Sequence, residues 1–278
     1  MSSVKMLSYI KRDTPVHNLC GVTKLVVFLA WTIVCMLSYD TRVLLVTLCF
    51  SLIIFKLARI RWREVRFVLA FIGFFLLLND VAIYIFSPEE GVNIYGTRHV
   101  LFQFSSRYTV TKEQLFYLFN VTLKYLTVVP VALLFLITTD PSEFAASLSG
   151  IGITYRISYA VSITLRYIAD IQNDFHNISQ AQQARGVDLS KNVSLKKRIS
   201  GIASIAVPLI FSSLERIDLI SNAMDLRGFG KHKIRTWYSA RPFKTADYIV
   251  LAGMVLFVLV GLYVTFHDGE RFFNPFVP

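Results

Sequence analysis

The sequence predicts an all-α integral membrane protein. Of its 278 residues, 54% are hydrophobic and 17% are charged, whereas an average soluble chain carries about 25% charged residues. The mean hydropathy is +0.54, and five apolar stretches approach the roughly 20 residues that a helix needs to cross a bilayer. Together these observations exclude a disordered chain, a collagen-like chain and a small secreted domain.

The five apolar stretches are the predicted membrane spans. They cover residues 23–39, 43–57, 67–86, 115–137 and 248–266. The first two are short enough to be tilted or to lie partly at the membrane interface. Asn79 and Asp80 lie in the third stretch and Lys124 in the fourth. Because charged groups are costly inside a bilayer, we expect Asp80 and Lys124 to form a structural pair or to extend towards the headgroups, rather than to bind substrate.

The distribution of Lys and Arg predicts the orientation of these spans. With all five stretches crossing the membrane, 23 of the 29 Lys and Arg residues lie on one side and five on the other, with Lys124 inside a span. Cytoplasmic loops carry the excess of positive charge in membrane proteins. The N-terminus is therefore predicted inside the cell and the C-terminus outside. The net charge of +11 reflects this topology rather than binding to nucleic acid.

Three domains follow from the spans and the polar segments. Residues 1–137 form an N-terminal membrane domain with four spans, residues 138–247 a cytoplasmic domain, and residues 248–278 a C-terminal transmembrane helix with an outer tail. The outer connection 87–113 is polar and alternates around residues 100–104, which predicts a lid or a short hairpin. Its role is left open.

The cytoplasmic domain contains one short and two long predicted helices. The short helix begins at Asp140-Pro141-Ser142-Glu143, a sequence that suits a helix start and a capping box, and Gly150 and Gly152 end it. The long helices cover residues 157–185 and 195–227, and Pro208 is expected to kink the second. Their apolar residues recur every three or four positions, so each helix carries one apolar stripe.

We expect each long helix to bury this stripe, with the two helices crossing each other and lying against the membrane domain. The polar face opposite the first stripe would then face the cytoplasm or a partner. The stripes comprise Val161, Leu165, Ile168, Ile171, Phe175 and Ile178 on the first helix, and Ile199, Ile202, Ala206, Ile210, Leu214, Ile217, Ile220 and Met224 on the second. The polar face of the first helix holds Asp170, Asn173, Asp174, Asn177 and Gln180.

Both long helices end in the same way, at Ala184-Arg185-Gly186 and at Leu226-Arg227-Gly228. Glycine is favoured just past a helix end because it adopts positive φ, and the helix dipole favours a cation in the last turn. Helix termination therefore explains either motif alone. Two such ends on paired helices also suit insertion into acidic grooves of another protein, because each guanidinium offers a rigid fork of donors for carboxylates.

Over nearly its whole length, the chain resembles the transmembrane T component (the EcfT/CbiQ-type family) of energy-coupling-factor importers. The segments that carry the resemblance are Asp13-Thr14-Pro15-Val16-His17-Asn18-Leu19 before Thr23-Lys24, Thr138-Thr139-Asp140-Pro141, Leu165-Arg166-Tyr167-Ile168, Ala181-Gln182-Gln183-Ala184-Arg185-Gly186-Val187-Asp188 and Asn222-Ala223-Met224-Asp225-Leu226-Arg227-Gly228-Phe229. The last two are the specific ones. Two features depart from the family pattern: Leu226 stands where Ala is frequent, and the connection 87–113 is longer than usual.

This resemblance implies a role for each part of the chain. Ala184-Arg185-Gly186 and Leu226-Arg227-Gly228 would dock into two ABC-type ATPase subunits, which bind the ATP, so this chain itself would need no cofactor. Residues 138–247 would be a coupling domain that passes ATPase motion to a small hydrophobic substrate-binding subunit, the S component, in the cell membrane of a prokaryote. The transported solute would be a vitamin, a metal ion or a similar micronutrient.

Two other classes of function stay open at this point. A conventional ABC-type permease subunit would line its own pathway with several polar positions per span, and a membrane enzyme would bring acid, base or metal ligands together. The five histidines are scattered, and Cys20, Cys35 and Cys49 have no metal or redox spacing. Gly228-Phe229-Gly230-Lys231 lacks the pattern of a phosphate-binding loop. We therefore expect a transporter subunit with no catalytic residues, no metal ligands and no bound cofactor.

A basic cluster at residues 191–198 precedes the second long helix. Such a cluster beside a membrane domain is expected to be a solvated turn or to contact lipid headgroups. Nucleic acid is not an expected partner of this chain.

Overall fold

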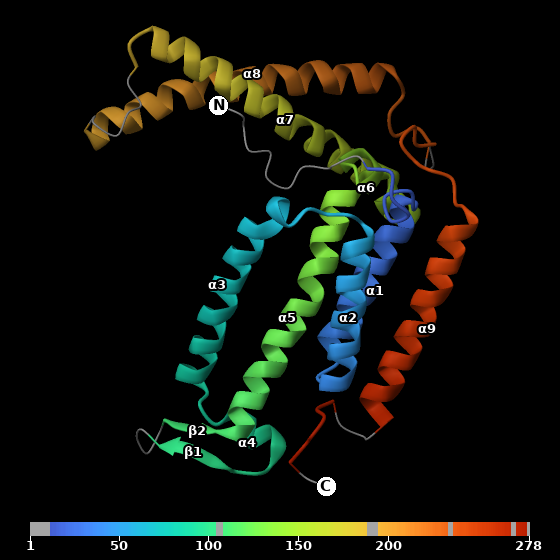
Figure 1. Ribbon diagram of the computed structural model, residues 1–278. Coiled ribbons are helices and arrows are strands. Elements are labelled where there is room, and N and C mark those ends of the chain that lie inside the picture. The colour runs from blue at the N-terminus through green and yellow to red at the C-terminus, as the bar shows by residue number, and fades with distance from the viewer. Residues whose placement is uncertain (1–11, 104–107, 188–193, 233–235, 268–270, 277–278) are drawn as a thin grey trace. The chain divides into compact units, whose positions relative to one another are not determined.

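Figure 1 shows the computed structural model of the chain, which describes residues 12–103, 108–187, 194–232, 236–267 and 271–276. The elements in chain order are α1 (Gly21–Leu37), α2 (Thr41–Leu57), α3 (Trp62–Phe86), α4 (Glu90–Tyr95), β1 (Val100–Gln103), β2 (Thr109–Thr111), α5 (Lys112–Thr138), α6 (Pro141–Gly150), α7 (Tyr155–Ala184), α8 (Leu195–Leu226) and α9 (Thr245–His267). Residues 191–193 of the predicted basic cluster lie outside the described residues.

The chain packs as two units. Unit 1 comprises Met1–Asp140 and Arg241–Pro278, and unit 2 comprises Pro141–Ala240. Packing therefore groups the C-terminal helix with the N-terminal helices, although it is distant from them in sequence. The three predicted domains divide the chain by role, and that division stays a prediction.

The described part of unit 1 is a bundle of five long helices, α1, α2, α3, α5 and α9, with α5 at its centre. This helix packs against α1, α2 and α3, and α9 packs against α1 and α2. Half of the most apolar part of α5 is buried, whereas α3 is exposed over most of its length. One apolar cluster contains Trp31, Cys35, Val131 and Met254, and a second contains Val65, Leu133 and Ile137. Both clusters include residues of α5, which makes α5 the centre of the bundle.

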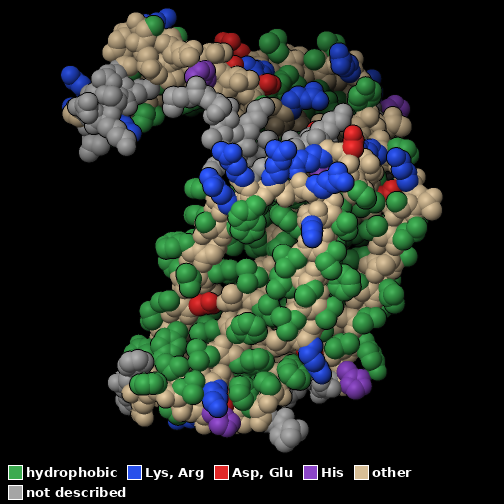
Figure 2. Space-filling view, in the orientation of Figure 1, with side chains coloured by type: hydrophobic (Ala, Val, Ile, Leu, Met, Phe, Trp, Pro, Cys, Tyr) green, Lys and Arg blue, Asp and Glu red, His purple; other side chains and the backbone are tan. Residues whose placement is uncertain are grey.

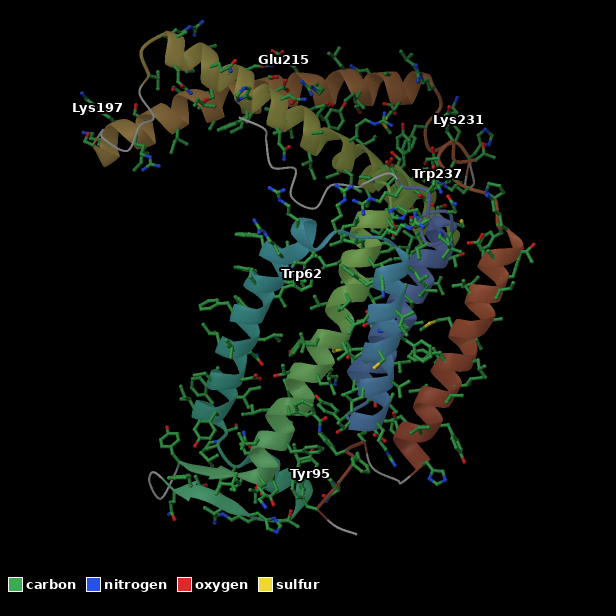
Figure 3. All side chains as sticks on the ribbon, in the orientation of Figure 1. Trp62, Tyr95, Lys197, Glu215, Lys231 and Trp237 are labelled. Carbon is green, nitrogen blue, oxygen red and sulfur yellow. The ribbon has the colours of Figure 1, made fainter. Side chains whose placement is uncertain are left out.

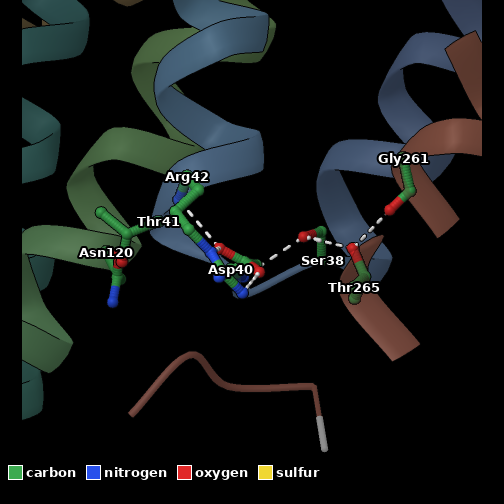
Figure 4. Close-up of polar contacts among 7 residues, drawn as sticks. All are labelled: Ser38, Asp40, Thr41, Arg42, Asn120, Gly261 and Thr265. Atoms are coloured by element: carbon green, nitrogen blue, oxygen red, sulfur yellow. Dashed lines mark hydrogen bonds and ion pairs between the residues drawn. The ribbon is translucent and has the colours of Figure 1, made fainter. Parts of the chain in front are cut away.

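Two hydrogen bonds fix the parallel helices α1 and α9 in register. At one end the Cys20 N–H donates to Asp247 Oδ1 at 2.8 Å. At the other end the Thr265 hydroxyl donates to Ser38 Oγ at 2.9 Å, as Figure 4 shows. Ser38 follows Cys20 by as many residues as Thr265 follows Asp247. The helices also approach closely, because a Cβ at Gly261 would lie 3.1 Å from Val34.

The prediction of an all-α membrane protein is confirmed. Within the described residues, three segments are long and apolar enough to cross a bilayer: Val65–Phe86, Lys112–Thr138 and Thr245–His267. With 17 residues each, α1 and α2 rise about 25 Å, less than the roughly 30 Å of a bilayer core. Because α1 stays beside α9 from end to end, the two helices cover the same depth. The predicted number of five spans stays a prediction.

Asp80 and Lys124 have separate partners. Asp80 Oδ2 accepts a hydrogen bond from the Thr122 hydroxyl at 2.7 Å. Lys124 Nζ donates to the Met36 carbonyl at 2.6 Å and lies 3.4 Å from the centre of the Tyr39 ring. The expected pairing between the two is thus not formed. Lys124 instead places its charge at the carboxyl end of α1, where the helix dipole is negative, and over an aromatic face.

The connection between α3 and α5 forms a hairpin and a short helix. The predicted hairpin is confirmed, because β1 pairs antiparallel with β2. The buried Glu113 carboxylate accepts hydrogen bonds from the His99 N–H at 3.0 Å and the Thr97 hydroxyl at 3.0 Å. The sequence did not predict α4, whose six residues are too few for a periodic pattern. This helix lies against α5 in the ribbon of Figure 1.

The C-terminal residues lie against this same end of unit 1, which we call the hairpin end. Asn274 Nδ2 donates to the Tyr95 carbonyl at 3.0 Å, and the Tyr95 ring meets the Phe272 and Phe276 rings edge to face. The Asn120 amide donates to the Tyr95 hydroxyl and accepts from Thr41. The outer tail expected from the sequence is therefore, over residues 271–276, a packed part of the bundle.

Gly91 tests the packing of α4 on α5. A Cβ at Gly91 would lie 2.5 Å from the Glu113 carbonyl oxygen and 2.6 Å from Gln114 Cα, both backbone atoms of a long helix. We therefore expect Gly91→Ala to lower the free energy of unfolding by about 1–3 kcal/mol, measured by denaturation in a mild detergent. Gly73→Ala in α3 is the matched control, since nothing lies within 4 Å of that Cβ. Equal stability of the two variants would contradict this packing.

Candidate functional site

The two long helices of unit 2 cross at a polar contact. The guanidinium of Arg216 on α8 lies 2.5 Å from Asp174 Oδ2 and 3.9 Å from Asp170 Oδ2, both on α7. The same guanidinium lies 5.7 Å from the centre of the Tyr167 ring. Asp170 and Asp174 are one helical turn apart and so present both carboxylates on one face. The crossing predicted from the sequence is therefore present, and an ion pair fixes its position (Figure 1).

The first candidate site residues lie at the end of α7. The helix ends at Ala184, Arg185 is its C-cap with φ −84° and ψ 8°, and Gly186 has φ 85°. The Gly186 N–H donates to the Gln183 carbonyl and the Val187 N–H to the Gln182 carbonyl, both at 3.0 Å. This pair of bonds defines a Schellman turn, which satisfies the last carbonyl groups of the helix.

The end of α8 has the same geometry. The helix ends at Leu226, Arg227 is its C-cap with φ −83° and ψ 5°, and Gly228 has φ 67°. The Gly228 N–H donates to the Asp225 carbonyl and the Phe229 N–H to the Met224 carbonyl, both at 2.9 Å. The two motifs, which we call the Arg tips (residues 184–186 and 226–228), therefore place Arg at the equivalent position of the same turn.

The short helix α6 separates the role of glycine from that of arginine. Its end has the same turn, with Gly152 at φ 99° and the Ile153 N–H donating to the Leu148 carbonyl at 3.1 Å. The residue at the C-cap is Ile151 rather than Arg. The turn therefore requires the glycine but not the arginine. Termination of the helix explains Gly186 and Gly228, and it leaves Arg185 and Arg227 unexplained.

Side chains of both Arg tips reach the surface. Arg185 and Arg227 are exposed, and Leu226 is 90% exposed, although an isolated Leu gains by burial. At the second tip an apolar and a cationic side chain therefore stand side by side. This combination suits contact with a partner more than contact with water.

An aromatic cluster attaches the end of α8 to the start of α7. The Phe229 ring lies 4.9 Å from that of Tyr159, and the Trp237 ring lies 5.4 Å from that of Tyr155. Arg156 donates to the Gly230 carbonyl at 3.1 Å. Figure 3 shows Trp237 and Lys231 beyond the end of α8, at the opposite end of the helix from Lys197.

This attachment separates the two Arg tips. The second tip lies at the start of α7, and the first tip lies at its end. The 30 residues of α7 rise about 45 Å. The tips are therefore presented at two places about the length of α7 apart, rather than side by side.

Within unit 2, the crossing of α7 and α8 leaves much of both apolar stripes exposed, and their expected contact with the membrane domain stays a prediction. Ile168, Ile171 and Phe175 are 40–49% exposed, and Ile199, Ile210 and Ile217 are 57–67% exposed. A single crossing of two long helices covers only a short part of each, so most of each stripe stays uncovered. Between α7 and α8 the uncovered residues line a groove of about 570 Å³, with Arg216 at its side.

Sequence reasoning missed the ion pair at the crossing and the aromatic cluster. The polar face that holds Asp170 and Asp174 is predicted to face the cytoplasm or a partner, whereas both carboxylates approach Arg216 of the neighbouring helix. The available signal was Arg216 itself, a cation placed directly before the stripe residue Ile217. The spacing of Tyr155 and Tyr159 by one helical turn was the signal for the cluster. Within the described residues, no group of three or more His, Cys, Asp or Glu side chains could hold a metal ion.

These features define a multi-spanning helical membrane protein whose inserted helical unit presents two matched Arg-Gly ends. The sequence model of the CbiQ family, described as cobalt transport protein, matches residues 12–237. The chain therefore belongs to this family and is an EcfT/CbiQ-type transmembrane component.

Three relatives have the same printed name, energy-coupling factor transporter transmembrane protein EcfT. That of Lactococcus lactis subsp. cremoris (strain MG1363) is 24% identical over 270 residues, covering 94% of this chain and 97% of the relative. That of Streptococcus thermophilus (strain ATCC BAA-250 / LMG 18311) is 26% identical over 266 residues, covering 90% and 96%. That of Exiguobacterium sibiricum is 28% identical over 204 residues, covering 70% and 73%.

Gly186 and Arg185 are expected to differ when each is replaced. Gly186→Ala forces a side chain into the left-handed region at a cost of about 1 kcal/mol, so amide exchange at residues 186 and 187 should accelerate about fivefold. Arg185→Gln changes the side chain at a position of negative φ, which needs no glycine, and should leave exchange unchanged. Hydrogen–deuterium exchange of the detergent-solubilised protein measures both. Equal acceleration in the two variants would mean that Arg185 itself holds the turn together.

Proposed function

We propose that this chain is the energy-coupling transmembrane subunit of an energy-coupling-factor importer. In this role the Arg tips receive motion from two ABC-type ATPase subunits, and unit 2 passes that motion to a small hydrophobic S component in the same membrane. ATP binds to the partner subunits, and this chain has no catalytic step. Family membership and the printed names of the relatives support the general role. The observation that carries the finer assignment is the pair of exposed Arg tips with matching backbone geometry.

The separation of the Arg tips supports two ATPase partners rather than one. A single acidic groove could accept two adjacent arginines, but tips about 45 Å apart need two grooves. An Arg guanidinium binds a carboxylate through two parallel hydrogen bonds, so each tip can be held in a defined orientation. The exposed Leu226 adds an apolar contact to the second tip. A matched pair of sockets on two copies of a partner fits these features.

The chain connectivity supports an orientation with unit 2 in the cytoplasm. The end of α5 and the start of α9 lie at the same end of unit 1, because Lys24 Nζ donates to the Thr138 carbonyl at 3.0 Å and the Cys20 N–H to Asp247. We call this the basic end, because Lys56 lies in the last turn of α2 and Arg59 and Arg61 follow in the connection to α3. Positive charge marks the cytoplasmic side. The N-terminus would then be inside and the hairpin end outside.

The solute is proposed to be a vitamin, a metal ion or a similar micronutrient bound by the S component. A permease that lined its own pathway would need a polar cavity among its spans. The cavity formed by α1, α2, α5 and α9 is instead lined almost wholly by apolar side chains. This observation favours a coupling role over a pathway role for the described part of unit 1.

Reversing the charge of both tips tests the proposal. We expect Arg185→Glu with Arg227→Glu to abolish recovery of ATPase subunits with the tagged chain, because two like charges would then face the acidic grooves. Walker A peptides identified by mass spectrometry after purification from the native membrane measure this recovery. Uptake of radiolabelled vitamins or metal ions by the same cells should fall at least tenfold, while the amount of chain in the membrane stays unchanged.

Lys196→Glu with Lys197→Glu is the matched control. These exposed residues lie at the start of α8, so the variant makes the same change in net charge away from the tip of that helix (Figure 3). Recovery of ATPases and uptake should both persist. Normal recovery of ATPases with the tip variant, or equal loss with the control, would contradict the proposed role of the Arg tips.

A further inference from the structure

The connection from α2 to α3, together with the adjoining helix ends, lies at the basic end of unit 1, and we call residues 56–66 the basic loop. Its cationic side chains are all exposed, and Trp62 is 69% exposed. Figure 2 shows Lys and Arg side chains gathered at this end of an otherwise apolar bundle surface. Tryptophan and basic residues at the end of a span are typical of the interface between headgroups and acyl chains. The loop cations are Lys56, Arg59, Arg61, Arg63 and Arg66.

Arg59 has an unusual backbone conformation. Among the described residues it is the one non-glycine residue with positive φ, at 53°. The helices α6, α7 and α8 all use glycine at the equivalent left-handed position, where a side chain costs about 1–2 kcal/mol. The Arg59 carbonyl accepts a hydrogen bond from Arg12. The residue with the strained backbone therefore carries its own guanidinium and also binds the guanidinium of Arg12.

An apolar groove begins next to this loop. It has a volume of about 290 Å³, and α1, α2, α5 and α9 contribute its walls. Ile54 and Leu57, in the last two turns of α2, form one wall, and Leu57 is only two residues from Arg59. Phe28 and Trp31 of α1 and Val250 of α9 form others. The groove therefore extends from the basic loop into the apolar depth of the bundle.

We propose that this groove binds one acyl chain of an anionic phospholipid whose phosphate contacts Arg59 and Arg61. The occupant must combine an apolar chain, which the groove accepts, with a negative headgroup, which the loop cations attract. A free phosphate ion would not fill the groove, and a zwitterionic lipid would not benefit from the net positive charge. The proposal does not depend on the Arg tips or on the partners proposed above.

Trp31 provides a direct reporter for this site. The chain has three tryptophans, so Trp62→Phe with Trp237→Phe leaves Trp31, in the wall of the groove, as the sole fluorophore. The protein in detergent micelles is titrated with phosphatidylglycerol or phosphatidylcholine that carries brominated acyl chains, which quench tryptophan at short range. We expect phosphatidylglycerol to reach half-maximal quenching at a micellar mole fraction about tenfold lower than phosphatidylcholine.

The informative variant is Arg59→Gly with Arg61→Gln in the same background. Glycine removes the strain at position 59. If Arg59 had only a structural role, the variant would be as stable as the parent protein or more stable, and it would keep the preference for phosphatidylglycerol. The proposal predicts that stability is kept and that the preference falls about tenfold, to near unity. Arg98→Gln with Lys112→Gln removes the same charge at the hairpin end and is the matched control, expected to keep the preference.

Three results would overturn the proposal. Equal quenching by both lipids in the parent protein would remove the headgroup preference, and a preference that survives Arg59→Gly with Arg61→Gln would place the headgroup elsewhere. A preference lost to the same extent in the control variant would reduce the effect to net charge. Because ATPase recovery does not enter this assay, the result is independent of the test of the Arg tips.

Discussion

The contact between Asp247 and the start of α1 is the constraint on which the arrangement of this chain depends. The buried Asp247 carboxylate accepts from the Lys244 N–H at 2.8 Å, which begins α9, and from the Cys20 N–H at 2.8 Å, which joins α9 to α1. The Asp247 side chain therefore caps the start of α9 and also bonds α9 to the start of α1. Because α9 follows unit 2 in sequence, this contact makes unit 2 an insertion with both ends held in one bundle.

An insertion held at both ends can transmit force, whereas an appended domain can swing freely. The chain that leads into unit 2 is held where Lys24 bonds to the Thr138 carbonyl. The chain that leads out of unit 2 is held by Asp247. Inside unit 2, the Arg216 ion pairs and the Tyr155 cluster join α7 to α8 at separate points. In the proposed role, a displacement at either Arg tip would move both long helices together. The rigidity of the pair thus follows from one contact at the crossing and one beside the second Arg tip.

Local pattern predicted much of this structure, and long-range pairing accounts for what was missed. The apolar stretches, both long helices and both Arg tips were visible because hydrophobic period and helix-ending glycine act over a few residues. The partners of Asp80 and Lys124 could not be predicted in this way. Thr122 comes close to Asp80, and Met36 to Lys124, only when the helices pack. Periodicity identifies the apolar stripes of the long helices but does not show what covers them. The packed tail at Phe272 and Phe276 carries no local signal.

Arginine beside a left-handed turn occurs three times in the described chain, in two different arrangements. In α7 and α8, glycine takes the strained position and Arg185 or Arg227 takes the relaxed one before it. The guanidinium can then be replaced without loss of the turn, which suits a contact made to another protein. At the end of α2, Arg59 takes the strained position itself, although glycine would be more stable there. A side chain at this strained position is best explained if the side chain binds a ligand. The apolar groove beside Arg59 indicates that this ligand is a lipid.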